Sequence, residues 1–272
     1  MIRHMYIPES PVSAFAETFW YLEERCAQVR DERSAPDGYV DLIVDLTAHE
    51  VRMANAANET LRPGSVFVCG PHTRHFVIGG SPETRVVGVR FRPGCAFPFL
   101  GVPLDLLQNT IVPLDAILGP AARDLRDELL EASDVPRLFG VLERRLPQLA
   151  AKPTEAHPAV RYAVERLSSG RGGEPAERIR RIVDETGLSH RRLIELFRRE
   201  TGYTPKQFGR VRRFQEALRK MHSDRPPRWP DLAAECGFSD QAHFIREFRA
   251  FSGLSPAAYE PVPGRDANHA PA

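Results

Sequence analysis

The sequence has little of what marks a secreted, membrane-bound or disulfide-rich protein. Its 272 residues include only four cysteines, which lie far apart and form no C-x-x-C pair, so neither a disulfide framework nor a zinc ribbon is indicated. No run of about 18 apolar residues occurs, and the first ten residues lack the apolar stretch of a secretory signal. We therefore predict a cytoplasmic protein with no membrane partner and with reduced cysteines.

Catalytic signatures are missing as well. The chain has no G-x-S-x-G, P-loop, G-x-G-x-x-G or H-E-x-x-H sequence. The nearest metal-ligand candidates are His72 and His75, but residues three apart on a strand face opposite sides, and no second pair of ligands accompanies them. We therefore predict no metal, no cofactor and no enzymatic activity.

The net charge of +1 is small, but the charges are unevenly distributed. Residues 1–152 hold 16 Lys and Arg against 20 Asp and Glu, whereas residues 153–261 hold 20 against 15. A modest excess of positive charge is compatible with a nucleic-acid partner, although it is also typical of an ordinary solvated surface. Charge thus points to the C-terminal part without deciding its function.

The first part of the chain has the pattern of short strands. Apolar residues alternate or cluster in Tyr39–Leu46, Ser65–Cys69 and Arg85–Phe91, and Gly and Pro separate these runs. From about residue 103 the spacing becomes helical, with amphipathic helices predicted at Pro120–Ala132 and Asp134–Leu149. Residues 1–152 are therefore predicted to form a sensor or dimerisation domain, β-rich to about residue 95, built as an antiparallel sandwich or small barrel with helices.

A linker is predicted at Lys152-Pro153-Thr154 and His157-Pro158, because each proline disfavours helix at the preceding residue. Residues 155–260 are predicted to form a separate helical domain. Residues 261–272 are polar and rich in Pro, Gly and Ala, so we expect a flexible tail. The helices predicted in the second domain span 159–168, 174–186, 190–201, 205–222, 229–236 and 240–251.

An internal repeat in the helical domain carries the functional argument. Residues 182–205 match residues 232–256, first at an offset of 50 and then of 51, so one residue is inserted at the start of the second copy's helix. In each copy a short helix stops at a glycine, an apolar residue fills the turn, and Ser189 or Ser239 is predicted to cap the next helix. This is the pattern of a helix-turn-helix unit. Helical hairpins in other proteins also use such turns, but two copies in one chain favour DNA binding.

The exposed face of each second helix is predicted to meet duplex DNA. The helix between the two units, Pro205 to His222, would be about 27 Å long. One turn of B-DNA is about 34 Å, so a single chain could read two successive major grooves. The predicted DNA-facing residues are His190, Arg191, Ile194, Glu195 and Arg198 in the first unit and Asp240, Gln241, His243 and Arg246 in the second, with Lys206, Arg210 and Arg213 of the spacer helix near phosphates.

These residues resemble the AraC/XylS family of transcription regulators. The resemblance lies in the GLS-x-R-x-L-x-x-x-F frame of the first unit, in Thr204-Pro205, and in AxxxGFSDQAHFxREFRxxxGxSPxxY of the second, residues 233–259. It implies a two-domain α+β protein: a cupin-like β-barrel with helices that pair two subunits, followed by an all-α DNA-binding domain with two helix-turn-helix units. It also implies base reading by Arg191, Ile194 and Glu195 and by Gln241, His243 and Arg246.

Two of these positions depart from the usual base-reading side chains. Ile194 and Glu195 cannot make the bidentate contacts of Arg or Gln, although Ile194 could touch a thymine methyl and Glu195 could accept a hydrogen bond from cytosine. Glu195 is equally well explained as an ion-pair partner of Arg191 or Arg198. The second unit is therefore expected to read more of the DNA sequence.

Ligand-binding candidates in the first domain are Asp37, Tyr39, Asp41, Phe67 and Phe91. The aromatic residues among them are also ordinary core residues, and the aspartates are also typical of turns and strand ends. The stripe of Leu138, Val141, Leu142 and Leu146 could pair two subunits or simply pack on the barrel.

The leading hypothesis is a one-component regulator that binds double-stranded DNA, responds to a small-molecule effector, forms a homodimer and contacts RNA polymerase if it is an activator. The alternatives are a DNA-docked cupin-type enzyme or repair protein, which needs a catalytic centre, and a helical adaptor, which predicts no salt-dependent binding to duplex DNA.

Overall fold

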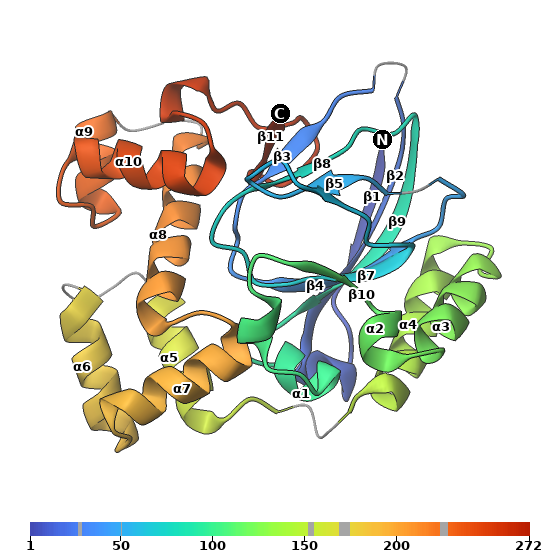
Figure 1. Ribbon diagram of the computed structural model, residues 1–272, viewed down its shortest axis with the longest axis horizontal. Coiled ribbons are helices and arrows are strands. Elements are labelled where there is room, and N and C mark those ends of the chain that lie inside the picture. Colours follow the sequence, from blue (N-terminus) through green and yellow to red (C-terminus); the bar gives the residue numbers. More distant parts are fainter. Residues whose placement is uncertain (27–28, 50, 152–154, 169–174, 224–227) are drawn as a thin grey trace.

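The computed structural model describes residues 1–26, 29–49, 51–151, 155–168, 175–223 and 228–272 (Figure 1). The predicted linker segment Lys152-Pro153-Thr154 and the predicted helix start at Glu174 lie outside these residues. A β-rich N-terminal part and a helical C-terminal part lie side by side, as the α+β prediction required.

Two antiparallel sheets form the N-terminal β-barrel. The first has the order β1 (Ile2–Tyr6), β2 (Ala16–Arg25), β9 (Glu83–Phe91), β4 (Val40–Asp45), β7 (Val66–Cys69) and β10 (Ile111–Pro113). The second has the order β11 (His269–Pro271), β3 (Glu32–Ser34), β8 (Phe76–Ile78), β5 (Met53–Ala54) and β6 (Thr60–Leu61). The three predicted strands correspond to β4, β7 and β9, whereas the long strand β2 was not predicted.

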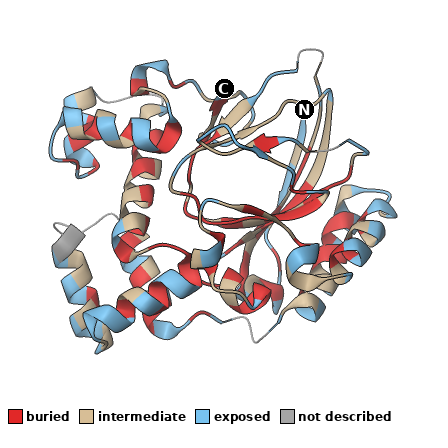
Figure 2. Ribbon diagram, in the orientation of Figure 1, coloured by how far each residue is buried: buried red, intermediate tan, exposed pale blue. Residues whose placement is uncertain are grey.

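The strands of the first sheet divide their side chains between two environments, because successive residues of a strand point to opposite faces. On β4, Val40, Leu42 and Val44 belong to the main hydrophobic core, whereas Asp41 and Ile43 line a cavity between the sheets. Figure 2 shows the resulting band of buried strands. The core therefore lies on the outer face of the sheet, and the cavity lies inside the barrel.

Helices cover the outer face of the first sheet. They are α1 (Ala96–Leu100), α2 (Asp115–Leu118), α3 (Ala121–Leu130) and α4 (Val135–Leu149), with 3-10 turns η1 (Val12–Ala14) and η2 (Leu104–Leu107). Helices α3 and α4 match the predicted pair to within two residues. The apolar stripe on α4 is buried in the domain's own core and packs on the barrel; its residues are Leu138, Val141, Leu142 and Leu146.

The C-terminal domain is built on one central helix. Its elements are α5 (Pro158–Ser168), α6 (Pro175–Thr186), α7 (His190–Thr201), α8 (Pro205–Met221), α9 (Trp229–Glu235), α10 (Gln241–Ser252) and η3 (Pro256–Ala258). Helix α8 joins the α6–α7 unit to the α9–α10 unit (Figure 1). Phe208 and Phe214 of α8 pack against Phe197 of α7 and Phe248 of α10, with ring centroids 5.6 and 5.2 Å apart. Both units thus share one core.

The C-terminal tail is not free, contrary to the prediction. After leaving the second unit it returns to the barrel, where β11 pairs with β3 in the register His269 to Ser34. Ala270 is fully buried, and the Ala35 backbone N–H donates to the Asn268 carbonyl at 2.8 Å. Residues 261–272 are polar, but their last part is ordered by backbone hydrogen bonds to the neighbouring strand, which do not depend on apolar side chains.

Candidate nucleic-acid interface and ligand cavity

The first helix-turn-helix unit has the predicted turn. Gly187 adopts a φ of +66°, which L side chains rarely reach, and the Ser189 side chain then accepts a hydrogen bond from the Arg192 backbone N–H at 3.2 Å. Ser189 is therefore the cap of α7, as predicted. Leu193 and Phe197 are fully buried, which turns the opposite face of α7 outward.

The second unit has a different cap from the one predicted. The side chain of Asp240 accepts from the His243 N–H at 2.7 Å, and α10 begins one residue later than expected, at Gln241. Ser239 instead donates its hydroxyl to the Asp240 carboxylate at 3.1 Å. The assignment of Ser239 as a cap was wrong, and the residue inserted in the second copy is the cap itself. The cap's hydrogen bonds lower the pKa of the Asp240 carboxyl, chiefly the one from the His243 amide.

The predicted reading positions lie together on two outer helix faces. Gln241 and Arg246 are exposed on α10, whereas His243 is half-buried and its Nδ1 lies 3.1 Å from the Ser239 hydroxyl. On α7 the Arg191 side chain forms an ion pair with Glu195 at 2.9 Å. This ion pair was one of the two roles that the sequence analysis considered for Glu195. The remaining predicted positions are His190 and Arg198, which are exposed, and Ile194, which is half-buried.

Two of the spacer's predicted phosphate contacts have internal partners instead. Arg210 forms a fork with the Glu247 carboxylate at 2.6 and 2.7 Å, and Arg213 donates to the Gly237 carbonyl at 2.9 Å with its guanidinium over the Phe238 ring. These arginines therefore fix the second unit on α8. Lys206 is exposed, with no ion-pair partner among the described residues.

A cavity of about 650 Å³ fills the barrel between its two sheets. Four of the five predicted ligand-contacting residues line it, namely Asp37, Tyr39, Asp41 and Phe67. Phe91 does not, because it pairs with Val40 and therefore faces the core, where it packs against Phe15 and Phe99. Its strand neighbour Arg90 pairs with Asp41 and faces the cavity.

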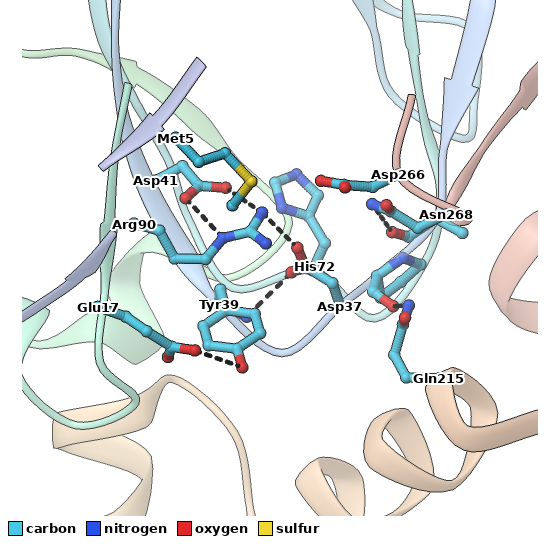
Figure 3. Close-up of polar contacts among 12 residues, drawn as sticks. Met5, Glu17, Asp37, Tyr39, Asp41, His72, Arg90, Gln215, Asp266 and Asn268 are labelled. Atoms are coloured by element: carbon cyan, nitrogen blue, oxygen red, sulfur yellow. Dashed lines mark hydrogen bonds and ion pairs between the residues drawn. The ribbon is translucent and has the colours of Figure 1, made fainter. Parts of the chain in front are cut away.

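Arg90 is the central charged group of the cavity, and sequence reasoning missed it. Its guanidinium binds Asp41 through Nε at 3.1 Å and Nη2 at 3.0 Å, and it binds Asp37 at 2.8 Å (Figure 3). The same group lies 4.7 Å from the centre of the Tyr39 ring. Burial raises the pKa of the Asp41 carboxyl, and Arg90 opposes that shift. The side chains of Arg90, Asp41 and Asp37 thus hold one another in place.

His72 contributes a neutral imidazole to the same cavity. Its ring is buried, and burial lowers its pKa to about 4, so the ring is uncharged at neutral pH. The Nδ1 atom lies 2.5 Å from the Gly70 carbonyl, which makes Nδ1 the protonated nitrogen. Nε2 is therefore a hydrogen-bond acceptor, with no partner among the described residues, and Figure 3 shows the ring beside the Arg90 cluster.

One wall of the cavity is formed by Trp20. Its indole lies across Gly88 of the neighbouring strand, where a Cβ atom would stand 2.2 Å from the ring. A glycine is therefore required at position 88 for this contact. The buried indole Nε1–H has no hydrogen-bond partner within the described part of the chain. An unsatisfied donor of this kind costs about 1–3 kcal/mol unless a bound molecule accepts from it.

The cavity lies close to the helical domain. Gln215 of α8 donates to the Pro36 carbonyl at 2.6 Å, and the Arg212 guanidinium lies 5.6 Å from the centre of the Tyr39 ring. The tail that follows the second unit adds Asp266 and Asn268 to the cavity lining. Asp266 pairs there with Arg3 at 2.6 Å. The chain that follows the second helix-turn-helix unit thus completes the cavity wall.

In the part of the chain that the structure describes, no group of three or more His, Cys, Asp or Glu side chains is arranged to hold a metal ion. Among the described helices, none combines the length and apolar character needed to cross a bilayer.

Comparison with known proteins gives two family matches. Residues 182–260 match a helix-turn-helix domain, and residues 4–113 match a domain of unknown function (DUF6597). No curated protein matches the chain significantly. Among solved structures, a probable AraC family transcriptional regulator from Rhodopseudomonas palustris is 30% identical over 37% of this chain and 92% of its own, with a TM-score of 0.33.

A second solved protein is similar over more of the chain. ToxT from Vibrio cholerae matches 88% of this chain and 96% of its own, with 11% identity and a TM-score of 0.47. ToxT has also been solved bound to (E)-4-(8-methylnaphthalen-1-yl)but-3-enoic acid, with 13% identity, 88% and 97% coverage and a TM-score of 0.48.

Proposed function

We propose a one-component switch for this chain, which belongs to the AraC/XylS family of transcription regulators: its two helix-turn-helix units bind duplex DNA, and its barrel cavity binds a small-molecule effector. The observation that carries the proposal is the cavity itself, whose wall includes the tail of the DNA-binding domain. Regulators of this kind act in the cytoplasm, where the chromosome is, and an activator would also contact RNA polymerase. The proposed role is regulatory and not enzymatic.

The cavity's charge favours a particular class of effector. Arg90 is already engaged by two carboxylates, so a carboxylate entering the cavity would meet Asp37 and Asp41 beside a guanidinium that both already occupy. The nearby Arg212 is not part of the cavity lining. His72 Nε2 adds a further acceptor. The charged residues that line the cavity are eight carboxylates, Glu24, Asp31, Glu32, Asp37, Asp41, Asp45, Glu83 and Asp266, and five arginines, Arg3, Arg30, Arg52, Arg90 and Arg265. A compact cation or hydrogen-bond donor with an apolar body fits this lining best.

DNA binding is tested by selecting duplexes from a random pool with the full-length protein and titrating the winners at two salt concentrations. We expect a bipartite sequence with half-sites about one helical turn apart and an affinity that falls steeply with salt. The proposal would be contradicted if no sequence were enriched or if the affinity did not depend on salt concentration.

The effector class is tested with probes that share one skeleton. Tryptamine, tryptophol and indole-3-propionate present an amine, a hydroxyl and a carboxylate on the same ring, and their effect on the melting temperature is compared. We expect the amine to stabilise the protein most, through linkage, and Asp41→Asn to abolish the effect. Asp124→Asn, at an exposed position of α3 outside the cavity lining, is the matched control. Stronger stabilisation by the carboxylate would reverse the proposed class.

A further inference from the structure

One short loop of the barrel contacts both recognition helices. The loop Gly70–His75 connects β7 to β8, and at its beginning Pro71 packs against Gly202, the residue that ends α7. A Cβ atom on Gly202 would stand 2.1 Å from the Pro71 ring, so only glycine allows this approach. The next residue, Tyr203, donates its hydroxyl to the His72 carbonyl at 2.8 Å. We call these contacts the first seat.

The other end of the loop holds the second recognition helix. The backbone N–H of His75 donates to the Phe251 carbonyl at 2.8 Å, in the last turn of α10. The His75 imidazole lies against Gly253, which ends α10, so closely that a Cβ there would be 2.5 Å from the ring. We call these contacts the second seat. The two seats are separated by only two loop residues, Thr73 and Arg74.

The two seats use equivalent points of the internal repeat. Gly202 and Gly253 correspond at the offset of 51 and have φ values of +74° and +75°. Both close the C-terminal end of a recognition helix, whereas the reading positions lie toward the N-terminal end. The loop can therefore hold both helices while most of the reading positions stay exposed, although Arg198 of α7 pairs with Asp105 of the N-terminal domain at 3.8 Å.

The loop also reaches into the cavity. The carbonyl of His72 belongs to the first seat, and its imidazole lines the cavity together with Arg90, Asp37 and Asp41 (Figure 3). The His72 backbone is therefore hydrogen-bonded to Tyr203, which directly follows the first recognition helix, and lies three residues from the bond to the second.

We propose that the loop Gly70–His75 is a shared seat that sets the separation and orientation of the two recognition helices, so that a cavity occupant acting on His72 changes both together. This inference rests on the proposed function. It differs from spacing by α8 alone, which would leave the distance between DNA half-sites independent of the barrel.

The test measures how strongly the DNA affinity of the full-length protein depends on the spacing between the two half-sites. Affinity is titrated for the selected bipartite duplex, for versions lengthened or shortened by two base pairs, and for a duplex with a single half-site. The proteins are the wild type, Tyr203→Phe, which removes only the hydroxyl of the first seat, and Gly253→Ala, which crowds the second seat. Tyr162→Phe is the matched control, because its hydroxyl contacts Glu185 in the same domain and not the loop.

We expect the wild type and Tyr162→Phe to lose about tenfold in affinity at the altered spacings, and either seat variant to lose less than about threefold. Unchanged binding of the single half-site shows that a variant is folded, and the two seats are tested independently. Equal spacing profiles in all four proteins would overturn the shared seat while leaving DNA binding by both units intact. The lack of any bipartite sequence would instead overturn the proposed function.

Discussion

The two helix-turn-helix units have the same plan but differ where they meet DNA and where they meet the barrel. On α7 the reading face carries an internal ion pair between Arg191 and Glu195, whereas Gln241 and Arg246 of α10 stand exposed. At the barrel it is the first unit that is more buried: Gly202 is buried at the first seat, whereas Gly253 remains exposed at the second.

This difference indicates that the two units have different roles. The first unit contacts the barrel at a more deeply buried position and has fewer exposed side chains without an internal partner among its predicted base-reading residues. The second unit is anchored more lightly and offers more hydrogen-bonding groups to a base edge. We therefore expect an effector signal to reach mainly the first unit and the DNA sequence to be read mainly by the second.

The largest expected effect is on stability and concerns the paired core positions Phe197 and Phe248. Both are fully buried, so Phe197→Ala and Phe248→Ala should each lower the free energy of unfolding by about 3–5 kcal/mol. Phe248 contacts the rings of Phe214, Phe244 and Tyr259, so its loss should be the greater. Urea denaturation measures both. A greater loss at Phe197 would mean that the first unit is the better packed one.

The next effect concerns the histidines of the two seats and pH. The pKa of His72 falls from 6.5 to about 4 on folding, so the unfolded chain takes up a proton as pH drops below 6.5 while the folded ring stays neutral. Stability is therefore present above pH 6.5 and is lost as the pH falls, by roughly 3 kcal/mol at pH 4. His72→Asn keeps a donor for the Gly70 carbonyl but cannot titrate, so its unfolding free energy should depend less on pH.

His75 sharpens the same comparison. Burial also lowers its pKa, with help from the Arg33 charge, but the ring is only half-buried. His75→Asn should therefore remove a smaller part of the pH dependence than His72→Asn, in urea titrations at pH 7 and pH 5. If the two variants reduced the pH dependence of unfolding equally, the histidines of the two seats would not differ in burial.

The reading faces are compared by base-specific titration. Arg246→Ala should cost about 1–3 kcal/mol in binding to the selected duplex and relax the preference at one base pair. Arg191→Ala should cost less, because Glu195 already engages that guanidinium. Arg249→Ala, at an exposed position of the last turn of α10, is the control for a lost positive charge. A larger loss at Arg191 would assign the main reading role to the first unit.

Sequence reasoning located the elements whose signals are local. The helix boundaries fell within one or two residues because apolar spacing and turn glycines such as Gly187 and Gly237 are encoded in neighbouring residues. The first strand pair, β1 with β2, was missed, and the sequence left both the cavity and the core open for Phe91, which lies in the core. Facing depends on register, and the register pairs Val40 with Phe91 and Asp41 with Arg90.

Long-range contacts were beyond the sequence. The partners of Arg90 lie 49 and 53 residues away, so no spacing rule connects them. The tail's partner strand is more distant still: His269 pairs with Ser34, and composition alone favoured disorder there. The cavity's polar centre and its closing strand could therefore be found only once the fold had brought them together.

The smallest expected effect separates the two caps. Ser189→Ala and Asp240→Ala should each lower the free energy of unfolding by about 1 kcal/mol, because each removes the acceptor for the first free N–H groups of a recognition helix. Ser239→Ala should cost only a few tenths of that amount, since Ser239 binds the cap and is not the cap itself. Urea titration of the three variants decides the matter. If Ser239→Ala were as costly as Asp240→Ala, the second copy's inserted residue would not be its cap, and the register of the repeat would have to move by one position.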